Sequence, residues 1–530
     1  MKLDEELWPD REDAFQTDDE ENRAEVSFNG DDDDSDSVHT PPSRISSELT
    51  DSPWPQSYRE SMNMFSSPTF SFVRIPSWRE SGKPTCQLDV DPESAFSKPL
   101  ISEGSVDFIE EMPTSTIPSI SDIVSQRGLS ICESLAPQQQ CSFAQAVLNG
   151  INVLFGLGLL TTPYAIREGG WLSLILLFMF FISCCYTGIL LKRCIQSSPG
   201  LQTYPDIGQA AFGKIGRVII SITLYVELYG ACVEYLIMMS DNLSMMFPNV
   251  YMHLAGMSFD AHKIFSFIAT LTILPTVWLR DLSLLSYLSV GGVGASILVV
   301  LCLLWVGVVD RVGFHAGGTA LDLANLSVSV GIYGFCYSGH SVFPNIYSSM
   351  KEPTQFPLVL IVSFLFCWFM YTAVAICGYL IFGDSVESQF TLNMPTQLVA
   401  SKIAVWTTIV CPMTKYALTI TPVALSLEEL LPSSLFRSRS ASILIRTILV
   451  TSTLVTAITV PFFGNLMALM GSLLAMLITL IFPCACYLSI HRGRLTKFDI
   501  ATCMFTMIIG AVSASAGTYS AIRRIAGQMS

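Results

Sequence analysis

Charged residues are scarce in this chain, and long stretches of it have almost none. Asp, Glu, Lys and Arg make up 14% of the 530 residues, whereas hydrophobic residues make up 51%. A positively charged segment followed by an apolar run is also missing near residue 1, so no cleavable signal peptide is evident. Because long apolar runs begin only near residue 143, we expect the first of them to direct membrane insertion itself.

The sequence also lacks the residue patterns that are typical of enzymes and metal sites. Only Cys86 and Cys132 of the 15 cysteines precede residue 140, and the others lie in or beside apolar runs, where we expect packing and no disulfides. Cys484-Ala-Cys486 lacks metal-ligand spacing. No nucleophile and base stand in a catalytic pattern. We therefore expect no enzymatic activity, no metal, no cofactor and no nucleic-acid partner.

The charge divides the chain into two regions near residue 140. Residues 1–140 hold 29 acidic and 10 basic residues, whereas residues 141–530 hold 15 acidic and 19 basic ones. The first region is rich in Ser, Asp, Glu and Pro and buries too little apolar surface to offset chain entropy. We predict a disordered acidic cytosolic N-terminal tail at 1–140 and a membrane domain at 141–530. Thr40, Ser52 and Ser67 each precede proline, a context that is compatible with phosphorylation by regulatory kinases. The alternative is a tail that is merely solvated.

The second region contains eleven apolar segments, most of them long enough to cross a bilayer core of about 30 Å. They lie near 143–165, 170–191, 217–246, 264–279, 284–309, 326–349, 357–382, 400–426, 442–462, 464–489 and 498–520. The sequence thus predicts an all-α polytopic membrane protein with eleven transmembrane helices.

Glycine interrupts the first and the sixth of these segments. The first contains Phe155-Gly156-Leu-Gly158, and the sixth contains Tyr337-Ser-Gly339-His340. Irregular backbone at bilayer depth persists only where it lines a cavity or is buried in protein, and matched interruptions in two halves indicate a transporter's substrate site. Because five spans separate the two starts, the second unit enters from the opposite face. This parity predicts a 5+5 inverted repeat of the leucine-transporter type, followed by one additional helix.

Basic residues predict the orientation. Twelve Lys and Arg residues lie beside loops on the side of the N-terminus, and six lie on the other side. Cytosolic loops carry the excess of positive charge, so we expect a cytosolic N-terminus and a luminal C-terminus.

The second region contains a series of distinctive motifs, namely Ser142-Phe-Ala-Gln-Ala-Val-Leu-Asn149-Gly-Ile-Asn152, Thr162-Pro-Tyr-Ala-Ile-Arg-Glu-Gly169-Gly-Trp171, Tyr204-Pro-Asp206-Ile-Gly208, Cys232-Val-Glu234-Tyr, Trp278-Leu-Arg280-Asp281, Ser338-Gly-His340-Ser-Val-Phe-Pro-Asn345 and Pro461-Phe-Phe-Gly464. With these motifs the chain resembles plant vacuolar amino-acid transporters of the amino acid/auxin permease family, within the amino acid-polyamine-organocation superfamily. The resemblance covers nearly all of 141–530 in order. It implies amino-acid substrates, coupling to protons and a vacuolar membrane.

The two interruptions supply the predicted substrate-binding residues. Open N–H groups at Gly156, Leu157 and Gly158 suit a carboxylate, and we expect free carbonyls near Tyr337, Ser338 and Gly339 to suit an ammonium group. Together they would bind a zwitterion. The resemblance adds Asn152, because sodium-coupled relatives use an asparagine there in an ion site, although proton-coupled relatives share it. The alternative is that the glycines only pack helices.

Four ionisable residues are candidates for proton coupling. Glu227 and Glu234 share one helical face of the third span, where a carboxylate either relays protons or makes a structural hydrogen bond. Lys415 lies inside the eighth span and either pairs with one of these acids or replaces a sodium ion near the first interruption. His340 follows the second interruption, as a titrating or a packing residue.

These patterns predict a secondary active transporter that moves amino acids across the vacuolar membrane and is coupled to the proton gradient, by symport or antiport. The expected partners are amino acids, protons and the lipid bilayer. Sodium-coupled or uncoupled amino-acid transport stays open as an alternative. A further alternative is an amino-acid sensor that uses the same site.

Overall fold

The structure is a computed structural model. It describes Trp54, Pro55, Tyr58 and residues 141–254, 257–279, 283–310, 312–314, 317–432 and 438–529. Residues Pro53–Ser530 form one compact unit. The tail residues for which disorder and phosphorylation are predicted lie outside the described residues. Three residues of the N-terminal region, Trp54, Pro55 and Tyr58, are described, and they contact the membrane domain.

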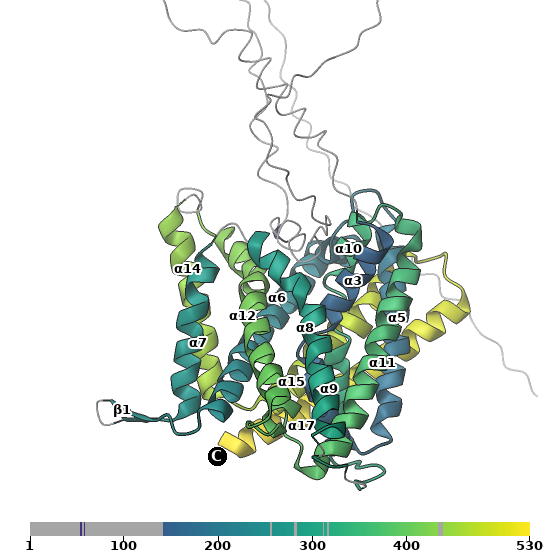
Figure 1. Ribbon diagram of the computed structural model, residues 1–530. Helices are drawn as coiled ribbons and strands as arrows, with labels where there is room; N and C mark the ends of the chain where they lie inside the picture. Colours follow the sequence, from purple (N-terminus) through teal and green to yellow (C-terminus); the bar gives the residue numbers. More distant parts are fainter. Residues whose placement is uncertain are drawn as a thin grey trace, which may run out of the picture. The chain divides into compact units, whose positions relative to one another are not determined.

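Helices make up nearly all of the described regular structure (Figure 1). They are α3 (Phe143–Leu154), α4 (Gly158–Gly169), α5 (Ser173–Ile195), α6 (Tyr204–Met246), α7 (Ala261–Trp278), α8 (Ser283–Val308), α9 (Leu326–Cys336), α10 (Phe343–Ser349), α11 (Phe356–Phe382), α12 (Val399–Glu428), α14 (Arg439–Thr459), α15 (Phe463–Met470), α16 (Phe482–Ile490) and α17 (Lys497–Met529). Two π-helical turns, Gly471–Ala475 and Leu477–Ile481, join α15 to α16. Short 3₁₀ turns occur at Pro353–Gln355, Gly383–Ser385 and Phe390–Asn393. Strands β1 (Met252–Leu254) and β2 (Met257–Phe259) pair antiparallel, with Met252 opposite Phe259.

The described residues contain nine helices that are long and apolar enough to cross a membrane, and the bent pair of α3 and α4 makes a tenth span. This confirms an all-α polytopic membrane protein. The predicted count of eleven further requires α9 and α10 to form one span, because α9 by itself has 11 residues and is shorter than each of the nine full-length spans. The 5+5 inverted repeat stays a prediction that follows from that count.

The two interruptions have different lengths. α3 begins at a capping box in which Ser142 and Gln145 bond each other's backbone N–H groups, and it ends at Leu154. Three non-helical residues, 155–157, follow it, and α4 then continues at an angle of 50°. Six non-helical residues, 337–342, separate α9 from α10. Both interruptions thus lie inside the predicted spans.

The third predicted span begins earlier than the hydropathy indicates. α6 starts at Tyr204 after a capping box between Thr203 and Asp206, and it bends at Gly213, where φ is 69°. Glycine adopts this left-handed conformation without strain. The bend brings Asp206 within 2.6 Å of Arg217, which lies on the other side of it.

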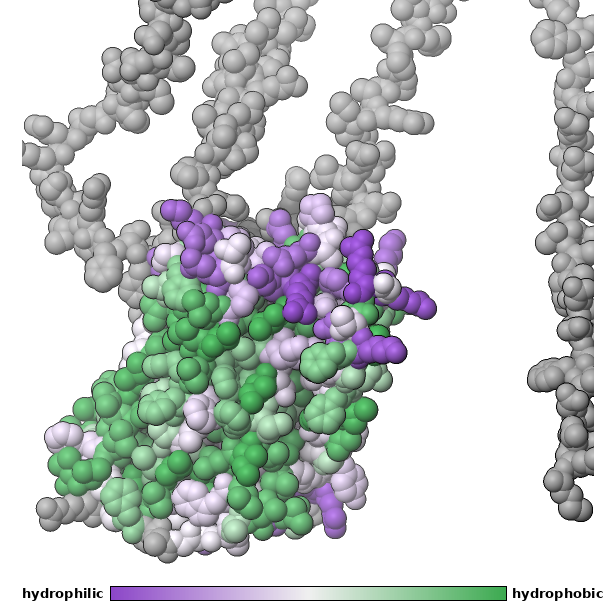
Figure 2. Space-filling model, turned by 90° about the vertical axis from the view of Figure 1, so that its right-hand side faces the viewer, coloured by the Kyte–Doolittle hydropathy of each residue, from purple (hydrophilic) through white to green (hydrophobic). Residues whose placement is uncertain are grey.

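The outer surface suits a bilayer. Leu271, Phe369 and Val512 lie on three different helices and are each more than half exposed. Figure 2 shows hydrophobic residues over the middle of the visible face and hydrophilic residues gathered at its upper end. That upper end is where α3 and α6 begin and where α12 ends, and we call it the α3 end (Figure 1). The interrupted helices lie at the centre, where α4 packs against α9 and α11.

Candidate functional site between the interrupted helices

The first interruption leaves backbone N–H groups open at the start of α4. Among the described residues, no hydrogen bond satisfies the N–H groups of Gly156 and Leu157. Leu157 precedes α4 without a side-chain cap, so the first turn of α4 lacks one as well. A Cβ added at Gly156 would have nothing within 4 Å. The start of α4 thus faces free space with donors and a positive helix end, an arrangement that favours an anion.

A cavity of about 130 Å³ adjoins these donors. Its volume is enough for several water molecules or a small polar ligand. Seven of the predicted site residues lie on its wall, namely Asn152, Gly156, Leu157, Gly158, Glu227, Ser338 and Lys415. The structure therefore brings residues of α3, α4, α6, α12 and the second interruption to one place.

Glu227 faces the second interruption from α6. Its Oε1 accepts a hydrogen bond from the hydroxyl of Ser338, and its side chain is nearly buried at the edge of the cavity. Carboxylates at this depth are costly and normally serve a function. The contact joins the acid of the third span directly to the non-helical residues of the sixth.

Lys415 reaches the first interruption from α12. Its Nζ donates to the carbonyl oxygen of Phe155 at 3.0 Å, and no ion pair joins it to Glu227 or Glu234 among the described residues. The first of the two expected arrangements, an ion pair, is thus wrong for this conformation. A Cβ added at Gly292 of α8 would lie 2.9 Å from Asn152 Oδ1 and 3.2 Å from Lys415 Cε, so this glycine makes room for both.

The second interruption is packed more tightly than predicted. The carbonyl of Tyr337 accepts from Gly339 N at 3.0 Å, and that of Gly339 accepts from Val342 N at 3.1 Å. The expectation of free carbonyls at these two residues is therefore wrong, because tight turns use them. The Tyr337 ring packs against Phe364 and Tyr371, and a Cβ at Gly339 would meet Leu154 Cδ2 at 3.1 Å.

Two predicted coupling residues lie away from the cavity wall. His340 is fully buried, and its Nε2 lies 2.9 Å from Thr187 Oγ1 and 3.1 Å from the Cys184 carbonyl of α5. Glu234 is fully buried one heptad after Glu227, and neither of its carboxylate oxygens has a hydrogen-bond partner among the described residues. The geometry of His340 matches the packing alternative. Glu234 stays a candidate, because an ionised carboxylate without donors is costly.

Sequence reasoning missed Tyr371 of α11. Its hydroxyl lies 2.5 Å from the Leu154 carbonyl and 3.0 Å from the Cys336 carbonyl, which are the last residues of α3 and α9. The single hydroxyl proton bonds one of these carbonyls at a time, and the hydroxyl lies within reach of both helix ends. Tyrosines are common in these spans, and nothing local distinguishes this one.

Sequence reasoning also missed Tyr235, Ser341 and Thr419 on the cavity wall. Tyr235 follows Glu234 in the motif Cys232-Val-Glu234-Tyr, and Thr419 lies one helical turn after Lys415. Helical spacing from Lys415 was therefore a usable signal for Thr419. A second cavity of about 50 Å³ shares Phe155, Gly156, Tyr235 and Lys415 with the first and extends between α8 and α12 along apolar side chains.

Apolar spans that enclose a cavity at interrupted helices, with a few polar side chains on its wall, are typical of a membrane carrier. The family model described as "Transmembrane amino acid transporter protein" matches residues 139–523, and the chain belongs to this family. Members of this family are transporters, not enzymes.

Two relatives from Arabidopsis thaliana support this assignment. Amino acid transporter AVT1D is 57% identical over 91% of this chain and 88% of its own length. Amino acid transporter AVT1E is 54% identical over the full length of both chains. These matches confirm the resemblance to plant transporters of this type. Among solved structures, a manganese transporter of Eremococcus coleocola is similar to 73% of this chain and 94% of its own, with a TM-score of 0.47 and 13% identity.

Proposed function

We propose that this chain is a secondary active transporter that moves amino acids across the vacuolar membrane and is coupled to the proton gradient. The observation that carries the proposal is the uncapped start of α4, which opens into a cavity with Glu227 and Lys415 on its wall. Family membership and the names of the Arabidopsis relatives supply the substrate class.

The substrate carboxylate binds at the first interruption in this proposal. The N–H groups of Gly156 and Leu157 donate to it, and the positive end of α4 adds electrostatic attraction. Lys415 donates to the carbonyl of Phe155, and the N–H of Gly156, which belongs to the same planar peptide unit, therefore points away from Lys415. The shape of this site therefore depends on α12 as well as on the interrupted span.

The substrate ammonium group then faces the opposite wall of the cavity. The Ser338 hydroxyl and the Glu227 carboxylate are the acceptors there, in place of the carbonyls that the turns of the second interruption already use. The apolar cavity between α8 and α12 receives the substrate side chain. This assignment favours small or apolar amino acids over charged ones.

Glu227 is the proposed coupling group. Its carboxylate contacts both the cavity and the residues that connect α9 to α10, so a change in its charge alters a contact that the conformational cycle must remake. A proton and the substrate ammonium group compete for the same carboxylate, which is the arrangement that an antiporter needs. Glu234 is the second candidate.

The proposed orientation places the α3 end in the cytosol and the C-terminus in the vacuolar lumen. The excess of Lys and Arg beside the loops of that end supports it. Protease added to sealed vacuoles is expected to cleave the tail without abolishing amino-acid flux. Protection of the tail from protease would show that the proposed orientation is inverted.

The test of the proposed function uses the purified full-length chain in liposomes with imposed gradients. A pH gradient is expected to drive amino-acid accumulation, and a sodium gradient of equal size is not. Accumulation that follows sodium alone would establish the sodium-coupled alternative. Saturable amino-acid binding without any flux would establish the sensor alternative.

A further inference from the structure

Three residues of the N-terminal region are placed against the α3 end of the membrane domain. Trp54 Nε1 donates to the Ser426 carbonyl of α12 at 2.9 Å, and the Tyr58 hydroxyl donates to the Ser341 carbonyl at 3.3 Å. Tyr58 is 1% exposed. Composition alone gives no reason for a residue of this acidic region to be buried in the membrane domain, so the contact requires an explanation.

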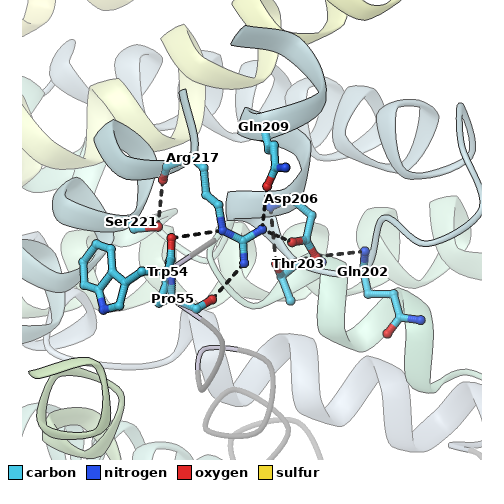
Figure 3. Close-up of polar contacts among 8 residues, drawn as sticks. All are labelled: Trp54, Pro55, Gln202, Thr203, Asp206, Gln209, Arg217 and Ser221. Carbon is cyan, nitrogen blue, oxygen red and sulfur yellow. Dashed lines mark hydrogen bonds and ion pairs between the residues drawn. The ribbon is translucent and has the colours of Figure 1, made fainter. Parts of the chain in front are cut away.

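Arg217 of α6 holds the backbone of this segment (Figure 3). Its Nε donates to the Trp54 carbonyl at 3.1 Å and its Nη2 donates to the Pro55 carbonyl at 2.8 Å. Nη1 meanwhile contacts Asp206 and Gln209, at 2.6 and 3.0 Å. The guanidinium is thus fixed by α6 and presents its remaining donors to two successive carbonyls, a planar fork that lysine cannot reproduce.

Aromatic rings continue the contact toward the cavity. The ring centroids of Trp54 and Tyr58 lie 5.8 and 6.0 Å from that of Tyr225. Tyr225 precedes Glu227 by two residues on α6, and Ser341 lies on the cavity wall. The segment therefore touches α6, α12 and the second interruption, the same three elements that form one side of the cavity.

We propose that Trp54, Pro55 and Tyr58 dock at the α3 end as a plug that closes the cavity toward that side. Release of the plug from Arg217 and Tyr225 opens the cavity, and the docked plug slows passage of solutes to that side. The surface formed by Arg217, Tyr225, Ser341 and Ser426 is its docking site. Access of a reagent to the cavity does not depend on transport, whereas the effect of the plug on amino-acid flux rests on the proposed function.

The test measures access to the cavity in the full-length chain. A cysteine introduced by Thr419→Cys lies on the cavity wall, and a membrane-impermeant maleimide is added from the side of the α3 end, with the unsubstituted chain as background. Trp54→Ala with Tyr58→Ala is expected to raise the labelling rate of this cysteine at least tenfold. Trp78→Ala, the matched control within the same acidic region, is expected to leave the rate at its native value.

A peptide that spans residues 50–62 provides the reciprocal arm. Added to the doubly substituted chain, it is expected to return the labelling rate toward the native value, and a peptide with Trp54 and Tyr58 replaced by alanine is not. If the double substitution unfolds the protein, Arg217→Lys replaces it, because lysine keeps the charge beside Asp206 but lacks the planar fork that reaches both carbonyls and Asp206. An unchanged labelling rate in a folded variant would contradict the plug proposal. An equal rise in the labelling rate with Trp78→Ala would contradict it as well.

Flux in liposomes separates the plug from the proposed function. Faster labelling with faster amino-acid flux supports both. Faster labelling with no amino-acid flux in any chain keeps the plug and rejects the transport proposal. Slower flux at an unchanged labelling rate rejects the plug, because the segment would then only support the active fold.

Discussion

Both helix interruptions contain glycine, but they differ in what they leave open. At the first, Gly156 faces free space, and the N–H groups of Gly156 and Leu157 donate no hydrogen bond to any described residue. At the second, turns use the carbonyls of Tyr337 and Gly339, and Gly339 packs against Leu154. The first interruption is therefore the proposed substrate site, and the second is a packed element that carries Ser338 to Glu227.

This difference shows that a glycine-rich interruption is not in itself a binding site. Each interruption follows one helix and precedes another, so each has a carbonyl end and an N–H end. At the second interruption the hydroxyl of Tyr371 lies 3.0 Å from the carbonyl of Cys336, and turns use the carbonyls of Tyr337 and Gly339. A side chain added at Gly156 would enter free space, whereas one added at Gly339 would meet packed atoms. We therefore expect equivalent substitutions to affect substrate binding at the first interruption and stability at the second.

The largest expected effect is that of Gly156→Val. Its side chain would extend into the free space that the ligand needs, so we expect substrate affinity to fall by about 100-fold or more with little change in stability, as steric exclusion from a tight site requires. The measurement is equilibrium binding by purified protein alongside its melting temperature. Unchanged binding would make Gly156 a packing residue.

Gly339→Val is the matched control for that substitution. It would push against Leu154 and Phe343, with ideal Cβ contacts of 3.1 and 3.2 Å, and we expect it to cost about 1–3 kcal/mol of stability, as overpacking does. Binding by the fraction that stays folded should be close to native. Equal effects of the two valines on binding would remove the contrast between the interruptions.

Glu227→Gln is expected to abolish accumulation driven by a pH gradient while exchange of amino acid persists. Glutamine keeps the shape and can still accept from Ser338, but it does not titrate. Exchange and accumulation in liposomes separate the two activities. Native pH dependence in this variant would transfer the coupling role to Glu234, Lys415 or His340.

Tyr371→Phe removes the hydroxyl that links α3 to α9. We expect a loss of about 1–3 kcal/mol, the cost of leaving a buried hydrogen-bond partner unsatisfied, together with weaker substrate binding. Tyr333→Phe deletes a hydroxyl that lies 3.2 Å from Ser173 Oγ, away from both interruptions, and is the control. A binding loss shared equally by both variants would contradict a specific role of Tyr371.

His340→Gln is expected to have the smallest effect. Glutamine can still bond Thr187, and the imidazole contacts α5 and not the cavity. The pH dependence of liposome uptake should therefore match that of the native chain. A displaced pH profile would show that His340 takes part in coupling.

The sequence predicted the membrane spans because hydropathy is a local property. It predicted both interruptions because glycine and the polar residues beside it are visible in the chain. The start of α6 was missed although Thr203-Tyr-Pro-Asp206 is a capping signal, since the apolar run itself begins later. Hydropathy therefore locates the buried part of a helix and not its ends.

Contacts between distant segments could not be predicted in the same way. The partners of Tyr371, Lys415 and Tyr58 lie 35 to 283 residues away, and only packing selects them. Seven of the eleven predicted site residues lie on the cavity wall because they belong to the interruptions or face them. Tyr337, Gly339, Glu234 and His340 lie behind that wall.

A structure of the purified full-length chain with a transported amino acid bound tests the central claim most directly. The account predicts a substrate carboxylate oxygen within about 3 Å of the backbone nitrogen of Gly156 or Leu157, the usual hydrogen-bond distance. The ammonium group should lie toward Ser338 and Glu227. A ligand bound to residues 337–342 with no contact to Gly156 or Leu157 would contradict the account.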